Sequence, residues 1–170
     1  EGLEDFAEAC GLLKNRGFEF LLLLVGNENA SGQDRGQIST LIAQVAANFD
    51  FTDWLIMPGR VPYEEVERYY SLIDIAPFPR KPWPVCEMVS PMKPLEALAM
   101  QKAVVVSSVQ ALSEMIQDEK TGLVFKKGDI NSLADALSRL IRSKELRESL
   151  GTEGRGWVQR FRTWDQIGEV

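Results

Sequence analysis

Residues 18–27 read Phe-Glu-Phe-Leu-Leu-Leu-Leu-Val-Gly-Asn, and this stretch decides the fold class. Its apolar run is continuous rather than alternating, which is typical of a strand buried on both faces of a parallel sheet. Gly26 and Asn27 then close the strand with turn-forming residues. Because such a strand needs a layer of helices on each face, the stretch predicts an α/β domain.

Helical and strand patterns alternate on both sides of this strand. Apolar residues between Leu3 and Leu13 recur at the spacing of one helix face, and Gly17 ends that helix. Further helices are predicted at 38–49, from Pro62, at 95–100, at 112–116, after an N-cap at Asp129, around 146–150 and after Thr163. Further strands are predicted at 54–57, 73–77, 103–106 and 123–125. The alternation indicates one domain over residues 1–170, with a parallel sheet between two layers of helices.

Composition narrows the classes of partner. The 170 residues, 45% of them hydrophobic and 26% charged, are ordinary for a globular domain. A net charge of −6 argues against nucleic acid as the main partner. No apolar run approaches the ~20 residues that span a bilayer, so we predict no transmembrane segment. Peripheral membrane contact of a longer parent protein stays open.

The rare residue types exclude several kinds of chemistry. The chain has no histidine, and Cys10 and Cys86 lack metal-ligand spacing, so a structural zinc site and histidine-dependent triads are excluded. Two isolated cysteines indicate a reduced, cytoplasmic protein. The acidic start at Glu1 is unlike a signal peptide, and without an initiating methionine the chain is expected to be a fragment. Its chemistry would rest on carboxylates, lysines, arginines and backbone amides, or on a partner domain.

Ligands of parallel sheets bind outside the carboxyl ends of the strands. The candidate loops follow Val25, Met57, Pro77 and Val106. Gly26 could let a ligand approach the backbone, or could simply end a strand. After the second strand come Gly59, Arg60 and Val61, where the arginine could meet a phosphate and the backbone could read a base edge; an ordinary exposed turn is the alternative. Tyr69 and Tyr70 fit a helix face packed on the sheet.

The segment from Glu87 to Ala99 reads EMVSPMKPLEALA and carries the most chemistry. It predicts a loop that runs into a helix N-terminus, where unpaired N–H groups favour an anion. Lys93 adds a positive charge there, and the two oxygens of Glu96 could accept hydrogen bonds from a vicinal diol such as a ribose. The alternative is structural, since an acidic residue in a first helical turn is favourable without any ligand.

Motifs in a fixed order cover nearly the whole chain. They are LLLVG at 22–26, MPGRVP at 57–62, YYSLID at 69–74, KPLEALAM at 93–100, KAVVVS at 102–107, EKTGLVF at 119–125, Gly128-Asp129 and Trp164-Asp165. This order resembles the C-terminal domain of the retaining GT-B glycosyltransferases of family 4, the glycosyl transferases group 1 family. The resemblance implies a Rossmann-like three-layer sandwich that forms the C-terminal half of a GT-B fold. It also implies that the first strand, its phosphate-binding loop and the N-terminal acceptor domain are missing.

The resemblance implies a site for a nucleoside-diphosphate sugar, which the parent enzyme would transfer with retention to an acceptor hydroxyl without a cofactor or bound metal. Glu96 matches the second glutamate of the family's E-x7-E region, which contacts the ribose. The loop would give backbone amides to the diphosphate and sugar; it consists of Met88, Val89, Ser90, Pro91 and Met92. Val61 would lie at the base, with Gly26, Gly59 and Arg60 nearby. Glu87 and Lys93 would carry catalytic roles at the sugar or phosphate.

Two departures from the family pattern leave other functions open. Met88 occupies the first glutamate position, one residue after Glu87, and Val109-Gln110-Ala111 replaces a glycine-rich stretch. A Rossmann-like binding module without transfer activity is therefore one alternative. Another is a different GT-B enzyme such as a nucleotide-sugar epimerase, against which the lack of histidine argues. Under the first interpretation the isolated chain is expected to bind the donor without turnover.

Overall fold

The computed structural model describes residues 2–26 and 36–162. The helices are α1 Leu3–Asn15, α2 Gln37–Asn48, α3 Val66–Leu72, α4 Pro84–Met88, α5 Lys93–Ala99, α6 Gln110–Ser113, α7 Ile130–Arg142 and α8 Lys144–Phe161, with 3-10 turns η1 Thr52–Trp54 and η2 Tyr63–Glu65. The strands are β1 Leu22–Val25, β2 Leu55–Gly59, β3 Ile75–Phe78, β4 Ala103–Ser107 and β5 Leu123–Phe125. The predicted α/β alternation is confirmed. The predictions for Asn27, Trp164-Asp165 and a helix after Thr163 lie outside the described residues.

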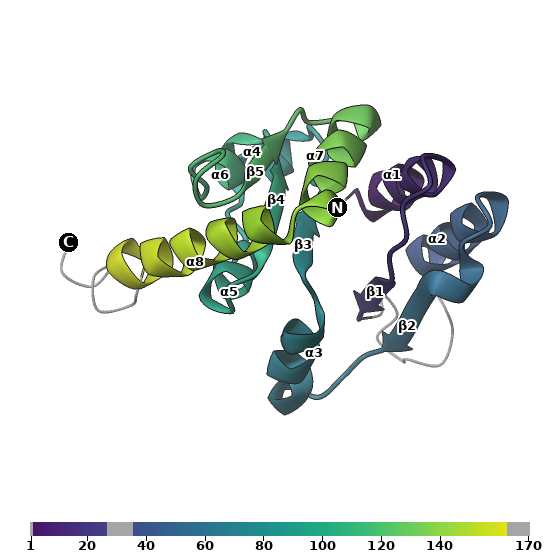
Figure 1. Cartoon of the computed structure of the whole chain (residues 1–170), viewed down its shortest axis with the longest axis horizontal. Coiled ribbons are helices and arrows are strands. Elements are labelled where there is room, and N and C mark those ends of the chain that lie inside the picture. Colours follow the sequence, from purple (N-terminus) through teal and green to yellow (C-terminus); the bar gives the residue numbers. More distant parts are fainter. Residues whose placement is uncertain (1, 27–35, 163–170) are drawn as a thin grey trace.

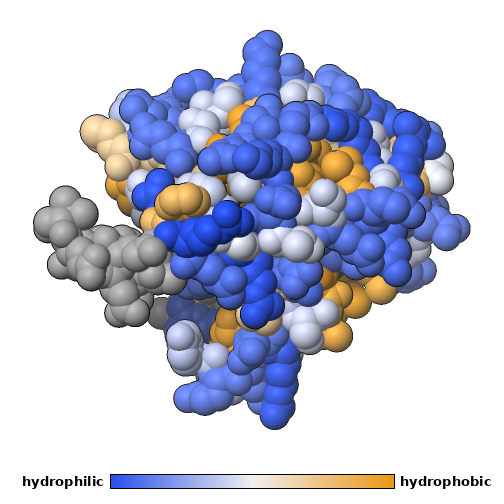
Figure 2. All heavy atoms as spheres, turned by 60° about the vertical axis from the view of Figure 1, so that its left-hand side comes forward, coloured by the Kyte–Doolittle hydropathy of each residue, from blue (hydrophilic) through white to orange (hydrophobic). Residues whose placement is uncertain are grey.

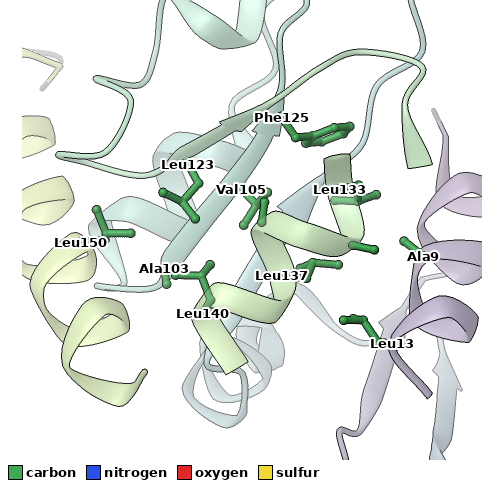
Figure 3. Close-up of a cluster of buried hydrophobic side chains, with 12 residues drawn as sticks. Ala9, Leu13, Ala103, Val105, Leu123, Phe125, Leu133, Leu137, Leu140 and Leu150 are labelled. Atoms are coloured by element: carbon green, nitrogen blue, oxygen red, sulfur yellow. The ribbon is translucent and has the colours of Figure 1, made fainter. Parts of the chain in front are cut away.

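Strand β4 is the centre of a three-layer sandwich. It pairs in parallel with β3 on one side and with β5 on the other, and all its residues are buried. Since successive side chains of a strand point to opposite faces, Ala103 and Val105 pack under α7 together with Leu13 of α1 (Figure 3). Val104 and Val106 enter a second cluster with residues of α5 and α6. The predicted layers of helix, sheet and helix are therefore confirmed around β4.

The strands form two parallel sheets rather than the single sheet that the sequence predicts. β1 pairs with β2, and β3, β4 and β5 form the other sheet. Among the described residues, neither β1 nor β3 has a strand partner on its other edge. The prediction that a first strand is missing concerns residues outside this chain and stays a prediction.

The strand predicted to be buried on both faces is shorter and more exposed than expected. Pairing begins only at Leu22, not at Phe18. Leu22 packs into a cluster with α1 and α2, whereas Val25 on β1 and Ile56 on β2 are exposed, Ile56 by 45%. The prediction of two buried faces is wrong for β1 because helices cover one face of this sheet and leave much of the other open to solvent.

Helix α1 joins the two sheets. Figure 1 shows it between α7 and α2, and it packs against both. Ala9 and Leu13 belong to the cluster beneath α7, and Ala7 and Cys10 belong to the cluster with α2 and β1. Helix α1 therefore contributes residues to two cores. Around them the surface is mainly hydrophilic, with separate apolar areas on the face shown in Figure 2.

Polar side chains cap the two C-terminal helices. Asp129 accepts a hydrogen bond from the Ser132 N–H at 3.0 Å, which confirms it as the predicted N-cap of α7. Ser143 caps α8 in the same way, accepting from the Leu146 N–H at 3.1 Å. This second cap was not evident from the sequence, where only the spacing of Leu146 and Leu150 indicated a helix.

Replacing Ser143 with alanine is expected to lower the free energy of unfolding by about 0.5–2 kcal/mol, because the N–H of Leu146 loses its partner. Urea denaturation followed by circular dichroism measures the loss. Ser149→Ala, an exposed serine inside α8, is the matched control and should have little effect. Equal effects of the two substitutions would contradict the capping role.

Candidate functional site

The candidate site lies on the loops that follow β3, β4 and β5. The chain after β3 forms α4, then the loop 89–92, then α5. The chain after β4 leads into α6, and the chain after β5 leads into α7. α4 and α6 pack against each other at this end of the sheet (Figure 1). Parallel sheets bind ligands at this edge, so a ligand site is expected here.

Part of the predicted loop is a helix. Pro84 begins α4, which continues to Met88, so Glu87 and Met88 are helical rather than part of a loop. Proline suits the first position of a helix because its missing N–H would be unpaired there in any case. The predicted helix at 112–116 lies earlier, at Gln110–Ser113, which brings its start next to α4.

The segment between α4 and α5 is open to solvent. The side chains of Met88, Val89 and Met92 are exposed, Met88 by 77%, and Ser90 is exposed as well. Within the part of the chain that the structure describes, no side chain caps the start of α5. α5 has only seven residues, so its first N–H groups and exposed Lys93 would act on a ligand more than its dipole would.

Arg80, in the chain after β3, fixes the shape of this loop. Its Nη1 donates to the Val89 carbonyl at 2.6 Å. A guanidinium–carbonyl bond is charge-assisted and therefore stronger than a neutral one. The loop whose amides are predicted to meet the diphosphate is thus held from the side of β3.

Glu96 lies in the first turn of α5 and is exposed. The Tyr70 hydroxyl, on α3, donates to Glu96 Oε2 at 3.3 Å. Burial and then the charge of Glu96 raise the pKa of Tyr70 to about 12, so the phenol stays protonated and can donate at neutral pH. Tyr70 also packs on the sheet, as predicted. Its hydrogen bond to Glu96 was not predicted from the sequence.

Replacing Tyr70 with phenylalanine is expected to weaken nucleotide binding about threefold to tenfold, because Glu96 loses the donor that orients it. Isothermal titration of the variant with a nucleoside diphosphate measures the change. Tyr69→Phe on the same helix is the control and should bind as the unaltered chain does. Equal affinities for all three proteins would show that Tyr70 does not orient Glu96.

Both carboxylate oxygens of Glu87 have partners. Oε2 accepts from the Gln110 N–H, the first of α6, at 2.7 Å, and Oε1 forms an ion pair with Lys127 Nζ. The hydrogen bond from Lys127, then the one from Gln110, holds the pKa of Glu87 below its ordinary value of 4.5. Glu87 is therefore an ionised residue that connects α4 to two neighbouring loops.

The glycines predicted at the site meet on the other sheet. The Gly26 N–H donates to the Gly59 carbonyl at 2.8 Å, and both residues have positive φ, 124° and 81°. Among the described residues, nothing lies within 4 Å of a Cβ built on either one, so these residues leave the backbone open to an approaching group. Arg60 is exposed and Val61 is half-buried. Gly26 and Gly59 lie at the ends of β1 and β2, whereas Glu87, Lys93 and Glu96 lie in the segment between two strands of the other sheet, β3 and β4.

Three residues of the site were not predicted: Tyr70, Arg80 and Lys127. Each lies in a segment next to a predicted strand, but its partner is 9 to 40 positions away in sequence. Basic residues in the loops after strands were the one available signal, and Arg80 and Lys127 carry it. Nothing in the sequence identifies which carboxylate or carbonyl they reach.

A pocket of about 210 Å³ adjoins the loop and is lined by Ser90, Met92, Leu95, Ala111, Glu114, Met115 and Arg162. Glu96 does not line it. Within residues 2–26 and 36–162, no group of three or more histidine, cysteine or acidic residues could hold a metal ion. No helix in that same part of the chain is both long and apolar enough to cross a membrane.

Comparison with known proteins gives consistent matches. The profile of the family described as glycosyl transferases group 1 matches residues 1–143. The amylovoran biosynthesis glycosyltransferase AmsK of Erwinia amylovora is 32% identical over 143 residues, which are 82% of this chain and 33% of AmsK. The chain spans 32% to 42% of the length of the curated relatives that it matches.

Two solved structures share the fold. The C-terminal domain of LpcC, a glycosyl transferase group 1 family protein from Francisella tularensis, superposes with a TM-score of 0.79 at 20% identity. That match covers 96% of this chain and 80% of LpcC's domain. The Anabaena protein HepE, solved in complex with UDP, gives a TM-score of 0.76 at 16% identity over 99% of this chain and 44% of HepE.

Proposed function

The chain belongs to the glycosyl transferases group 1 family, and on that premise we propose that it holds the nucleoside-diphosphate sugar of a glycosyltransferase. The observation that carries the proposal is the exposed carboxylate of Glu96, oriented by Tyr70 beside an open loop and Lys93. A nucleotide has a diol, a diphosphate and a base in a fixed order. The site offers a group for each of them.

Glu96 would bind the ribose. Its carboxylate has two acceptor oxygens, and the bond from Tyr70 occupies one lone pair of Oε2, which leaves the remaining capacity for the two hydroxyls of a diol. The carboxylate is exposed, so a ligand reaches it without displacing protein groups. Hydrogen bonds to a charged group are stronger than neutral ones, which suits Glu96 for the principal ribose contact.

The diphosphate would lie over the segment from Met88 to Lys93. The N–H groups of Ser90, Met92 and Lys93 would donate to its oxygens, since Pro91 has no N–H and the Val89 N–H is bonded to the Val85 carbonyl. The Lys93 ammonium would balance part of its charge. We propose that amides and cations fill the role that a metal ion fills in other transferases. Donors that are already in place stabilise a leaving diphosphate without reorganising during the reaction.

The base would lie at the ends of β1 and β2. The open backbone at Gly26 and Gly59 allows a flat group to approach, with Arg60 and Val61 following directly. HepE, whose structure contains UDP, shares the fold around these strands, which supports a nucleotide as the ligand class.

The parent enzyme would transfer the sugar with retention of configuration. The bond between the anomeric carbon and the diphosphate oxygen breaks, a bond to an acceptor oxygen forms, and the proton of the acceptor hydroxyl passes to the leaving diphosphate. The acceptor would be held by an N-terminal domain, so we expect this chain by itself to bind the donor without transferring it. Cys10 and Cys86 are free and buried, which is compatible with a reducing, cytoplasmic setting.

Titration of the labelled chain with UDP, GDP and ADP, followed by amide chemical shifts in NMR spectra, tests the proposal. One nucleotide is expected to shift the amides of Val61, Ser90 and Glu96 together. AMP, which lacks the second phosphate, is the control for ADP and should shift the amide of Ser90 less. If a folded chain shows no shifts with any nucleotide, the donor-binding function is wrong.

A further inference from the structure

The ion pair between Glu87 and Lys127 joins three loops at the carboxyl edge of the larger sheet. Glu87 follows β3, and Lys127 follows β5. The Gln110 N–H, which also donates to Glu87, follows β4. One carboxylate, on helix α4 after β3, therefore contacts a group from each of the segments that follow β4 and β5.

Backbone contacts lock the same corner from the side of β4 and β5. The Lys127 N–H donates to Ser108 Oγ at 3.0 Å, and the Ser108 N–H donates to the Phe125 carbonyl at 2.8 Å. These hydrogen bonds fix the backbone of Lys127, and its side chain extends from there to Glu87. The Lys127 ammonium therefore acts together with the Gln110 N–H bond and the packing of α4 on α6 in holding α4 in place.

The loop that begins one residue after Glu87 is also fixed at Val89. Arg80 Nη1 donates to the Val89 carbonyl, and the Val89 N–H closes the last turn of α4 on the Val85 carbonyl. Between them, Glu87 and Arg80 hold both sides of Met88. The amides from Met88 to Met92 therefore start from a defined shape.

Both carboxylate oxygens of Glu87 have hydrogen-bond partners in this arrangement. A sugar hydroxyl that bound Glu87 directly would compete with the Gln110 N–H or the Lys127 ammonium. The side chains of Glu87 and Lys127 are only 26% and 39% exposed, which limits access to the pair. A role through the neighbouring loop requires no such competition.

We propose that Glu87 is a positioning residue and that Lys127 is its partner, the pair holding the loop of residues 88–92 in the shape that receives the donor diphosphate. The proposal rests on the donor-binding function proposed above. Binding groups that are held in place before the ligand arrives lose less entropy on binding, so the pair acts on affinity through the loop. The direct contact with the sugar or phosphate that the family resemblance implies for Glu87 is the competing assignment.

A double-mutant cycle on the 170-residue chain separates the two assignments. The proteins are the unaltered chain, Glu87→Gln, Lys127→Met and the double variant, each titrated with UDP, GDP and ADP. We expect each single substitution to weaken binding of the preferred nucleotide about fivefold, and the double variant to bind no more weakly than either single variant. Lys127→Arg, which keeps the charge, should restore most of the affinity.

The amides report the loop directly, without a ligand. In the nucleotide-free chain, Glu87→Gln and Lys127→Met should both shift the Val89, Ser90 and Gln110 amide signals and speed their hydrogen exchange. Lys126→Met is the matched control, because this neighbouring lysine is exposed and, among the described residues, its ammonium group pairs with Asp129 and not with Glu87. It should change neither the loop amides nor the affinity.

Two results would overturn the positioning role. In the first, Lys127→Met leaves nucleotide affinity unchanged while Glu87→Gln lowers it, which would assign Glu87 a direct contact with the ligand. In the second, the effects of the two substitutions simply add. If the unaltered chain binds no nucleotide, the proposed function and the positioning role fail together, whereas the two results above leave donor binding standing.

Discussion

Replacing Glu96 with alanine is expected to lower the affinity for the preferred nucleoside diphosphate about 10-fold to 100-fold. Hydrogen bonds to a charged group contribute about 1.5–3 kcal/mol, and 1.4 kcal/mol corresponds to a factor of ten in affinity. The substitution also leaves the Tyr70 hydroxyl without its acceptor. Isothermal titration with each nucleotide measures the loss.

The 2′-deoxy form of the same nucleotide sharpens this prediction. The unaltered chain should prefer the ribonucleotide, because the deoxy form offers Glu96 one hydroxyl instead of two, and Glu96→Ala should abolish that preference. Glu153→Ala, an exposed glutamate in α8, serves as the control and should bind both forms as the unaltered chain does. If the Glu96→Ala variant still bound the ribonucleotide more tightly than the 2′-deoxy form, the ribose diol would be bound by a residue other than Glu96.

Replacing Leu13 with alanine is expected to lower the free energy of unfolding by about 2–5 kcal/mol. Leu13 is 1% exposed and packs with residues of α7, while neighbouring positions of α1 pack with α2. A cavity at Leu13 weakens the contact through which α1 joins the two sheets. Urea denaturation followed by circular dichroism gives the change.

Leu72→Ala is the matched control for the core substitution. Leu72 is 72% exposed at the end of α3, so the same chemical change there should alter stability by about 0.5 kcal/mol or less. If Leu13→Ala destabilised the chain no more than Leu72→Ala, α1 would not be packed as described.

Local patterns predicted the elements well because apolar runs and helical spacing are properties of neighbouring residues. The strand at 123–125 was predicted at its observed limits, and β4 extends one residue past its predicted end at Val106. Burial was harder to predict. The run that ends at Val25 is as apolar as β4, yet β4 has helices on both faces and β1 does not. Which faces are covered depends on the arrangement of whole elements, which no single run encodes.

The parts of the site that are local in sequence were the ones predicted. Glu96, Lys93 and the loop before them lie within one short segment, whose composition predicts a helix N-terminus that could bind an anion. The supporting contacts are long-range. Lys127 reaches Glu87 across 40 positions, and Tyr70 reaches Glu96 across 26, so the fold has to be known before either pair can be identified.

Intermolecular nuclear Overhauser effects between the bound nucleotide and the chain test the central claim most directly. With the nucleotide that binds best, the account predicts cross-peaks from the ribose protons to the side-chain protons of Glu96, and from the base protons to Val61. Ribose cross-peaks confined to another part of the surface, such as the residues around Asp5 and Asp129 between α1 and α7, would contradict the account.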